Sequence, residues 1–293
     1  MRTHCIFLTV TLFIASTVVA SAQSLVNGFF SGKGRGAVAV SYSAEHYDEV
    51  FLVPSNAKGV PIFREVDVNS VSLFATYGLT DRLEATVSLP YITAKGQADP
   101  AVLEALGYEN ERKGLQDLSL ALKYRLHRLS IGMGRLDVGG GLGLRTPVGS
   151  YRVDEGLQSI LAIGNRATAV TAMALLHWQS MQGIFITAQG GYSLRSGEVP
   201  NAWIGEIKAG YAHRAFYVDV WYAGQRSVDG VNILGEGFIG FFPATDVTYT
   251  RGGVNAFVPV VSGIGISAGV NKYLSGRNVG ASTGFYGGIV YSF

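Results

Sequence analysis

The sequence predicts an all-β fold: a transmembrane antiparallel up-and-down β-barrel of about twelve strands. Three observations lead to this prediction. The carboxyl-terminal segment alternates large apolar with small residues and ends in an aromatic residue, runs with a two-residue period recur along the chain, and the connections between these runs alternate between short and long. After residue 22, no stretch approaches the roughly 18 apolar residues of a membrane-spanning helix, so strands are expected to cross the membrane.

The carboxyl-terminal strand carries the most informative pattern. Phe285, Gly287 and Ile289 lead at two-residue intervals to Tyr291 and Phe293. An aromatic last residue on an alternating strand resembles the sorting signal of outer-membrane barrels. Tyr291 and Phe293 are therefore predicted to form a membrane-assembly signal, with the barrel assembly machinery and periplasmic chaperones as partners. The expected location is the outer membrane of a Gram-negative bacterium.

The amino terminus agrees with export. Arg2 precedes a mostly apolar run from Ile6 to Ala20, and Ala20-Ser21-Ala22 forms an A-x-A cleavage site. We therefore expect a signal peptide over residues 1–22 and one mature domain, the outer-membrane barrel, over residues 23–293. A membrane-spanning helix is the alternative, but the apolar run is short for a bilayer and no basic stop-transfer cluster follows it.

Composition excludes several kinds of chemistry. The chain has 23 basic and 21 acidic residues, and loss of residues 1–22 removes one basic residue and no acidic one, which leaves 22 and 21. Nucleic acid is not an expected partner, because its binding needs a concentrated basic face. Cys5 is the single cysteine and leaves with the signal peptide, so no thiol chemistry is expected. No cofactor or metal site is predicted, and the expected surroundings are outer-membrane lipid and lipopolysaccharide.

The alternating runs also predict where strands and connections lie. Short links and long connections that alternate along a chain are typical of outer-membrane barrels, which have short periplasmic turns and long extracellular loops. The predicted strands lie near 36–45, 64–77, 83–95, 114–126, 135–146, 165–178, 183–195, 201–213, 215–226, 245–256, 263–274 and 281–293. The predicted short links are 78–82, 179–182, 213–214 and 258–262, with a slightly longer one at 127–134, and the long connections are 46–61, 96–113, 147–163 and 227–244.

Two long connections have features of their own. Asp99 is a predicted N-cap with Pro100 at the first helical position, so residues 101–106 are expected to form a short surface helix that ends at Gly107. Loop 227–244 is unusually apolar for an exposed connection. We expect it either to fold into the mouth as a constriction or to pair as strand extensions above the membrane. The chain leaves no room for a large amino-terminal plug domain.

Alternation assigns each side chain to the lipid or to the lumen. In the run at 114–126, Leu118 and Leu122 face outward and Lys123 faces inward, and the same parity places Gln116 outside and Leu115 inside. The lumen-lining candidates identified in this way are Glu84, Asp117, Lys123, Arg125, Asp137, Arg145, Arg195, Glu206, Lys208, Asp219, Tyr217 and Trp221.

These lumen candidates allow two interpretations. Charges inside so narrow a tube must be paired or hydrated. They form either a salt-bridged scaffold that stiffens a mostly closed barrel, or a constricted polar pore whose mixed charge gives little ion preference. In the same way, Tyr217 and Trp221 either contact an apolar or aromatic solute or fill space.

Three stretches resemble a known family of outer-membrane proteins, the MetA-pathway phenol-degradation-like group. They are "YGLTDRLEATVSLPYI" (Tyr77 to Ile92), "GLQDLSLALKYRL" (Gly114 to Leu126) and "SGKGRGAVAVSYS" (Ser31 to Ser43), which together cover less than a fifth of the chain. The resemblance implies a barrel of about twelve strands with a passive or facilitative uptake role, that is, a transporter or channel for small and hydrophobic or aromatic molecules. It transfers no binding residues.

Two other functions remain as alternatives. One is a structural or adhesive barrel that binds partners through its surface loops. The other is a barrel lipid hydrolase, which needs a histidine base within hydrogen-bond reach of a serine nucleophile. His177 and Ser180 are three residues apart, which puts their side chains on opposite faces of a strand. The histidines are therefore expected at interfaces or turns, and the chain is not expected to be an enzyme.

Overall fold

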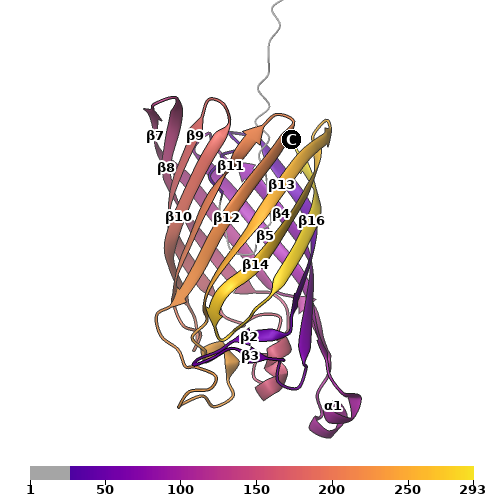
Figure 1. Ribbon diagram of the computed structural model, residues 1–293. Helices are drawn as coiled ribbons and strands as arrows, with labels where there is room; N and C mark the ends of the chain where they lie inside the picture. The colour runs from indigo at the N-terminus through magenta and orange to yellow at the C-terminus, as the bar shows by residue number, and fades with distance from the viewer. Residues whose placement is uncertain (1–26) are drawn as a thin grey trace, which may run out of the picture.

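The computed structural model describes residues 27–293 and shows a closed antiparallel β-barrel (Figure 1). The predicted signal peptide, residues 1–22, lies outside the described residues. Each long strand pairs with its neighbour in the chain, and the cylinder closes where the first strand, β1, pairs with the last, β16. The predicted fold class is confirmed.

Twelve long strands build the cylinder. Most of their ends lie within a few residues of the positions that the alternation predicts. They are β1 (Gly36–Tyr47), β4 (Glu65–Gly78), β5 (Leu83–Gln97), β7 (Asp117–Ile131), β8 (Gly134–Pro147), β9 (Ala169–Ser180), β10 (Ile184–Arg195), β11 (Ala202–His213), β12 (Phe216–Ser227), β13 (Thr248–Val261), β14 (Ile264–Arg277) and β16 (Thr283–Ser292).

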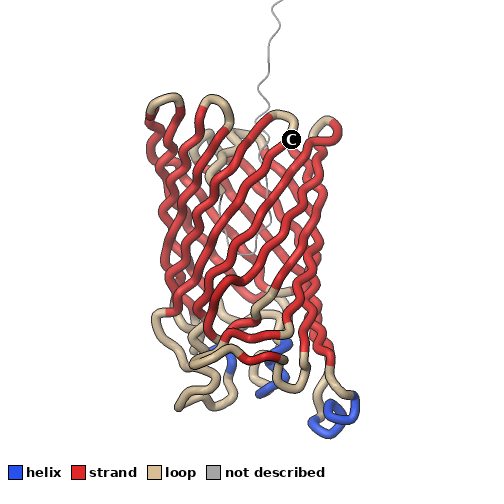
Figure 2. The backbone as a smooth tube through the Cα atoms, in the orientation of Figure 1, coloured by secondary structure: helices blue, strands red, loops and turns tan. Residues whose placement is uncertain are grey.

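The two ends of the cylinder differ, as Figure 2 shows. One end, called here the short-turn end, carries tight links such as the one between β4 and β5, where the Thr80 hydroxyl accepts hydrogen bonds from the amides of Arg82 (3.1 Å) and Leu83 (2.9 Å). The predicted link at 127–134 is wrong, because β7 continues to Ile131 and only two residues turn into β8. The opposite end, called the long-loop end, carries the long connections.

The long-loop end has structure of its own. It holds a small sheet of β2 (Glu49–Phe51), β3 (Ala57–Lys58) and β15 (Val279–Gly280), the strand β6 (Glu111–Leu115), which extends the sheet beside β5, and the 3-10 helices η1 (Gly156–Leu161) and η2 (Phe242–Ala244). The predicted surface helix is confirmed as α1 (Pro100–Leu106). The Asp99 carboxylate caps it by accepting from the Ala101 amide, and Gly107 ends it in the left-handed conformation.

Some of these loops share an apolar core. Phe63, Leu103, Tyr151 and Leu161 belong to one buried cluster above the strands. Loop 227–244 instead hydrogen-bonds to the connection between β14 and β15, where the Asn278 carboxamide accepts from the Ile233 amide at 3.2 Å. The loops at this end therefore hold defined positions.

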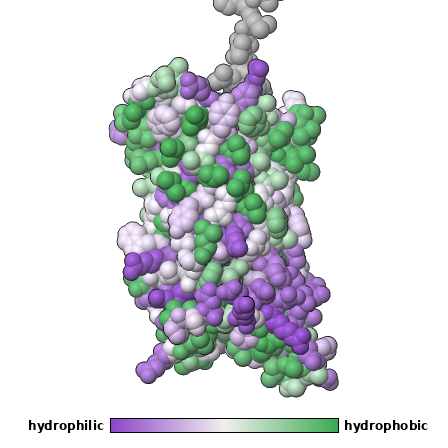
Figure 3. Space-filling model, in the orientation of Figure 1, coloured by the Kyte–Doolittle hydropathy of each residue, from purple (hydrophilic) through white to green (hydrophobic). Residues whose placement is uncertain are grey.

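The strands alternate between the two faces of the wall. On β7, Leu122 and Tyr124 are 49% and 45% exposed, whereas Ala121 and Lys123, which point inward, are 6% and 1% exposed. Figure 3 shows apolar groups spread over the strands, while polar groups gather on the part of the wall near the long loops. No helix in the described part of the chain is long and apolar enough to cross a membrane.

Two irregularities change the predicted parity on this part of the wall. The break between β6 and β7 at Gln116 turns Gln116 into the lumen and leaves Leu115 42% exposed, the reverse of the prediction. A β-bulge between Arg125 and His127 then inserts one residue and brings Arg128 to the inner face. An uninterrupted two-residue period gives no sign of either change.

Candidate functional site: a lumen in two parts

A short segment that precedes β1 lies inside the barrel at the short-turn end. It comprises residues 27–31 and is called here the amino-terminal segment. Gly28 fits tightly, because a Cβ atom there would lie 2.2 Å from Nδ1 of His177 and 2.6 Å from the hydroxyl oxygen of Thr187. Only glycine can occupy that position without displacing its neighbours. A segment of five residues, far shorter than a plug domain, therefore fills this end of the lumen.

Lys123 fastens the amino-terminal segment to the wall. Its ammonium group forms an ion pair with Glu84 (2.8 Å) and donates hydrogen bonds to the Asn27 carbonyl oxygen (3.0 Å) and to the carbonyl oxygen of Phe29. Glu84 in turn accepts a hydrogen bond from the Ser31 amide at 2.7 Å. Both side chains are almost fully buried, so their charges are satisfied by each other and by the segment's backbone.

Aromatic rings hold the same segment from the other side. The Phe29 ring lies 4.4 Å from His177, 5.0 Å from Phe185 and 6.2 Å from Tyr217, in edge-on arrangements. The predicted lumen candidate Tyr217 therefore packs on the segment. His177 is 2% exposed and lies in the lumen, so its expected place at an interface or turn is wrong.

The other charged candidates near the short-turn end form local networks. Asp137 binds Arg128 through both carboxylate oxygens, at 2.6 and 2.7 Å, and lies 3.4 Å from Arg125. Asp219 accepts hydrogen bonds from the Tyr217 hydroxyl and, at 2.9 Å, from the Asn255 carboxamide. Asp137 is thus paired with cations, whereas Asp219 is held by neutral donors.

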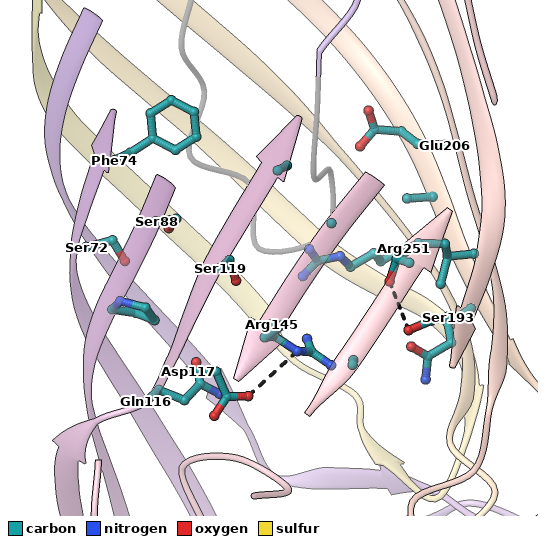
Figure 4. A pocket seen from close by; sticks show the side chains of 18 of the residues that line it. Ser72, Phe74, Ser88, Gln116, Asp117, Ser119, Arg145, Ser193, Glu206 and Arg251 are labelled. Carbon is teal, nitrogen blue, oxygen red and sulfur yellow. Dashed lines mark hydrogen bonds and ion pairs between the residues drawn. The ribbon is translucent and has the colours of Figure 1, made fainter. Parts of the chain in front are cut away.

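The other part of the lumen, toward the long-loop end, contains a cavity of about 400 Å³. One wall, called here the serine wall, consists of hydroxyl groups on four neighbouring strands. Figure 4 shows Ser72, Ser88 and Ser119 on this wall, with Phe74 beside them. The serine wall comprises Ser41, Ser43, Ser70, Ser72, Ser88 and Ser119.

The opposite wall carries three arginines and is called here the arginine wall. Arg145, Arg195 and Arg251 project from β8, β10 and β13, and Figure 4 shows Arg145 and Arg251 extending into the cavity. The Arg145 side chain is 44% exposed and lies 3.6 Å from Asp117. The cavity therefore carries charged groups on its wall and is accessible to water.

The sequence-predicted candidates divide between these two parts. Asp117, Arg145, Arg195 and Glu206 line the cavity, and Lys208 lies behind Glu206 at 3.5 Å. The remaining candidates lie outside the cavity lining: Glu84, Lys123, Arg125, Asp137, Asp219, Tyr217 and Trp221. No residue of loop 227–244 lines the cavity.

Sequence reasoning missed the amino-terminal segment and the third arginine. Arg251 follows directly from the alternation of β13, because it shares its parity with Asn255 and Phe257, and both are buried inside the barrel. The amino-terminal segment had a weaker signal, the Phe29-Phe30 pair between Gly28 and the glycines that precede β1. Among the described residues, no group of three potential metal ligands occurs.

A closed antiparallel barrel with an apolar outer face and a polar lumen has the architecture of outer-membrane β-barrels. Within that class, the chain belongs to the MetA-pathway of phenol degradation family, whose sequence profile matches residues 58–286. The resemblance noted from the sequence is thereby confirmed. No curated protein matches the sequence.

Solved structures share the fold. The chain is similar to the COG4313 outer membrane channel from Pseudomonas putida F1, with a TM-score of 0.68 and 16% identity over 92% of this chain and 100% of that one. It is also similar to the KdgM porin in complex with disordered oligogalacturonate, with a TM-score of 0.50 and 6% identity over 87% of this chain and 99% of that one. At these identities the likeness concerns the fold.

Proposed function

We propose that this protein is a passive or facilitative channel for small molecules in the outer membrane of a Gram-negative bacterium, and that its solutes carry apolar or aromatic groups. One observation carries the proposal: a cavity of about 400 Å³ lies inside a cylinder whose outer face suits lipid. Binding sites for small molecules typically have volumes of about 300–1,000 Å³. A barrel that served only as a scaffold would have no need for such a space.

The lining supports a solute with an apolar part. Tyr273 and Tyr286 border the cavity on β14 and β16, between the two walls. Phe74 lies on β4 with the serines, and Tyr249 lies on β13 with Arg251. Rings of this kind pack against apolar or aromatic bodies, while the hydroxyl and guanidinium groups solvate polar substituents. The family to which the chain belongs is described by phenol degradation, which fits a solute with an aromatic ring.

Passage toward the periplasm depends on the amino-terminal segment. The turns of the short-turn end are taken to face the periplasm, as in bacterial barrels in general. Residues 27–31 lie across the lumen at that end, so the segment restricts the path that leads out of the cavity.

Conductance measurements test the proposal. Purified protein in planar bilayers should conduct weakly, and deletion of residues 27–30 should raise the single-channel conductance several-fold. The matched control is Arg152→Gln, because the Arg152 side chain is 80% exposed in a loop and does not line the cavity. Liposome swelling with benzyl alcohol tests passage of an aromatic solute. A deletion variant that folds but neither conducts nor admits solute would refute the channel.

The two alternatives make different predictions. A structural or adhesive barrel would remain closed after deletion of the amino-terminal segment, and its partners would bind the ordered loops. A lipid hydrolase needs its base at the lipid-facing surface, whereas His177 is buried under Phe29, with its Nδ1 atom 2.8 Å from the Thr187 hydroxyl. The position of His177 inside the barrel gives the hydrolase no support.

A further inference from the structure

The arginine wall concentrates positive charge on one side of the cavity. Arg145, Arg195 and Arg251 come from three different strands, β8, β10 and β13, yet all three line the same cavity, as does Tyr249. Arg251 is held in place by aromatic rings, with its guanidinium carbon 5.4 Å from the centre of the Trp221 ring and 5.6 Å from that of Tyr273. Arg251 is therefore oriented by its aromatic neighbours.

The carboxylates that line the cavity already have partners close by. Asp117 accepts a hydrogen bond from the Tyr151 hydroxyl and lies beside Arg145. Glu206 accepts from the Gln189 carboxamide at 2.9 Å and forms an ion pair with Lys208. Asp117 is thus engaged by Arg145 and by a loop tyrosine, and Glu206 by groups on β10 and β11.

The third cavity carboxylate, Glu45, belongs to β1 and not to the strands of the arginine wall. It accepts a hydrogen bond from the Ser282 hydroxyl at 2.9 Å. None of the three carboxylates forms an ion pair with Arg195.

Arg195 interacts with neutral oxygen atoms instead. Its guanidinium donates to the Gln225 carboxamide oxygen at 2.6 Å and to the Pro200 carbonyl oxygen at 3.3 Å. Its Nε atom is buried and has no hydrogen-bond acceptor among the described residues. No carboxylate of the described residues forms an ion pair with it. A buried guanidinium whose charge is not matched by a carboxylate favours an anion beside it.

The serine wall, on the opposite side of the cavity, also favours a solute whose anionic group points toward the arginine wall. The serine wall offers hydroxyl groups, and its two outer strands, β1 and β7, also carry the carboxylates Glu45 and Asp117, which do not attract an anion. An anionic group is thus drawn to the arginine wall, and an attached ring meets Tyr249 and Tyr273 beside it. Guanidinium groups bind planar carboxylates through two parallel hydrogen bonds, which gives direction as well as strength.

We infer that the cavity is a binding site for a small organic carboxylate with an aromatic or apolar body, and that Arg195 and Arg251 bind its carboxylate. The inference rests on the proposed function, because it names the class of solute that the channel takes. It concerns one local site and leaves the expectation of little overall charge preference unchanged, because three carboxylates, Glu45, Asp117 and Glu206, line the same cavity as the three arginines.

Binding of two matched solutes tests the inference. Benzoate and benzyl alcohol have the same ring and nearly the same size, but only benzoate carries a negative charge. In equilibrium dialysis with the folded protein in detergent, benzoate should bind at least about tenfold more tightly, the ratio expected for one charge-assisted hydrogen bond. The double variant Arg195→Gln with Arg251→Gln should lose this preference, and the control Arg152→Gln should keep it.

Further variants and a second measurement keep the result decisive. Heat-dependent migration in SDS electrophoresis reports whether each variant folds. If the double variant does not, Arg195→Lys keeps the charge but loses the planar fork, and it should reduce the benzoate preference several-fold. Equal binding of the two solutes by wild type, or an unchanged preference in a folded variant, would overturn the inference. Dialysis measures binding alone, so a closed bilayer would refute the channel without altering this result.

Discussion

The two parts of the lumen are built from the same strands but differ in what fills them. At the short-turn end, the amino-terminal segment, paired charges and aromatic rings occupy the space, and Lys123 and Glu84 are almost fully buried. Toward the long-loop end, a cavity of about 400 Å³ remains between the serine wall and the arginine wall. Charges that are paired stabilise one conformation, whereas a charge without a protein counter-ion is available to a solute.

The largest effect is expected from the buried ion pair. Lys123→Met leaves Glu84 buried without its cation, which costs about 3–5 kcal/mol in comparable pairs. We expect a marked fall in the temperature at which the heat-dependent mobility shift occurs. The double variant with Glu84→Gln should recover part of the loss. A K123M barrel as heat-stable as wild type would show that the filled part of the lumen does not depend on this pair.

A smaller and more local effect is expected at Phe29. Truncation of a buried phenylalanine costs about 3–5 kcal/mol, but here the segment can leave its site without unfolding the barrel. In a Ser31→Cys background, Phe29→Ala should raise the rate of maleimide labelling about tenfold or more. Phe30→Ala is the comparison and should have a smaller effect, because Phe30 is only half-buried, although its ring lies 4.3 Å from the Lys123 ammonium. If Phe29→Ala is labelled at the same rate as its Ser31→Cys parent, the aromatic contacts do not hold the segment.

The rim of the cavity should respond to pH. Tyr151 lies in the loop after β8, and burial together with its hydrogen bond to Asp117 raises the pKa of the Tyr151 hydroxyl above its ordinary value. The stabilisation by this bond is complete below the unfolded pKa of about 10 and is lost as pH rises through the higher folded pKa. Proteolysis of loop 148–168 should therefore accelerate only at strongly alkaline pH.

Tyr151→Phe provides the control for that prediction. It should cost about 1 kcal/mol, the net contribution of a typical hydrogen bond, and should accelerate proteolysis at neutral pH. The same change should abolish the alkaline acceleration. A wild-type loop whose proteolysis does not respond to alkaline pH would show that the Tyr151 hydroxyl does not secure the rim.

The smallest effect is expected on the serine wall. Ser72→Ala removes a hydroxyl whose partner is the Ser70 hydroxyl at 3.2 Å, and water in the cavity can replace that contact. We expect less than about a twofold change in conductance or in benzoate binding. A larger change would mean that the serine wall takes a direct part in solute recognition.

Alternation predicted most of the fold because lipid and water constrain every second residue in opposite ways. Glu206, Lys208, Asp219 and Trp221 face inward as the period of two requires. The period carries no information about a residue inserted by a bulge, so Arg128 was assigned to a turn. It also cannot describe a segment outside the sheet, and the amino-terminal segment was missed for that reason.

The division of the lumen into a filled part and a cavity could not be predicted from the sequence either. The two-residue alternation predicts that Lys123 and Arg195 both point inward, but it does not predict which of them forms an ion pair with a carboxylate. That outcome depends on the height of each residue along the cylinder and on which strands face each other across it. The signs of the charges were therefore predictable, whereas their pairing was not.

The five residues of the amino-terminal segment touch strands distributed around much of the circumference. Lys123 and Glu84 hold it from β7 and β5, and His177, Phe185 and Tyr217 contact it from β9, β10 and β12. Such an arrangement acts as an internal brace. Squeezing the cylinder toward an oval cross-section would pull these anchors apart, so the segment gives the wall mechanical stiffness that hydrogen bonds between adjacent strands alone do not supply.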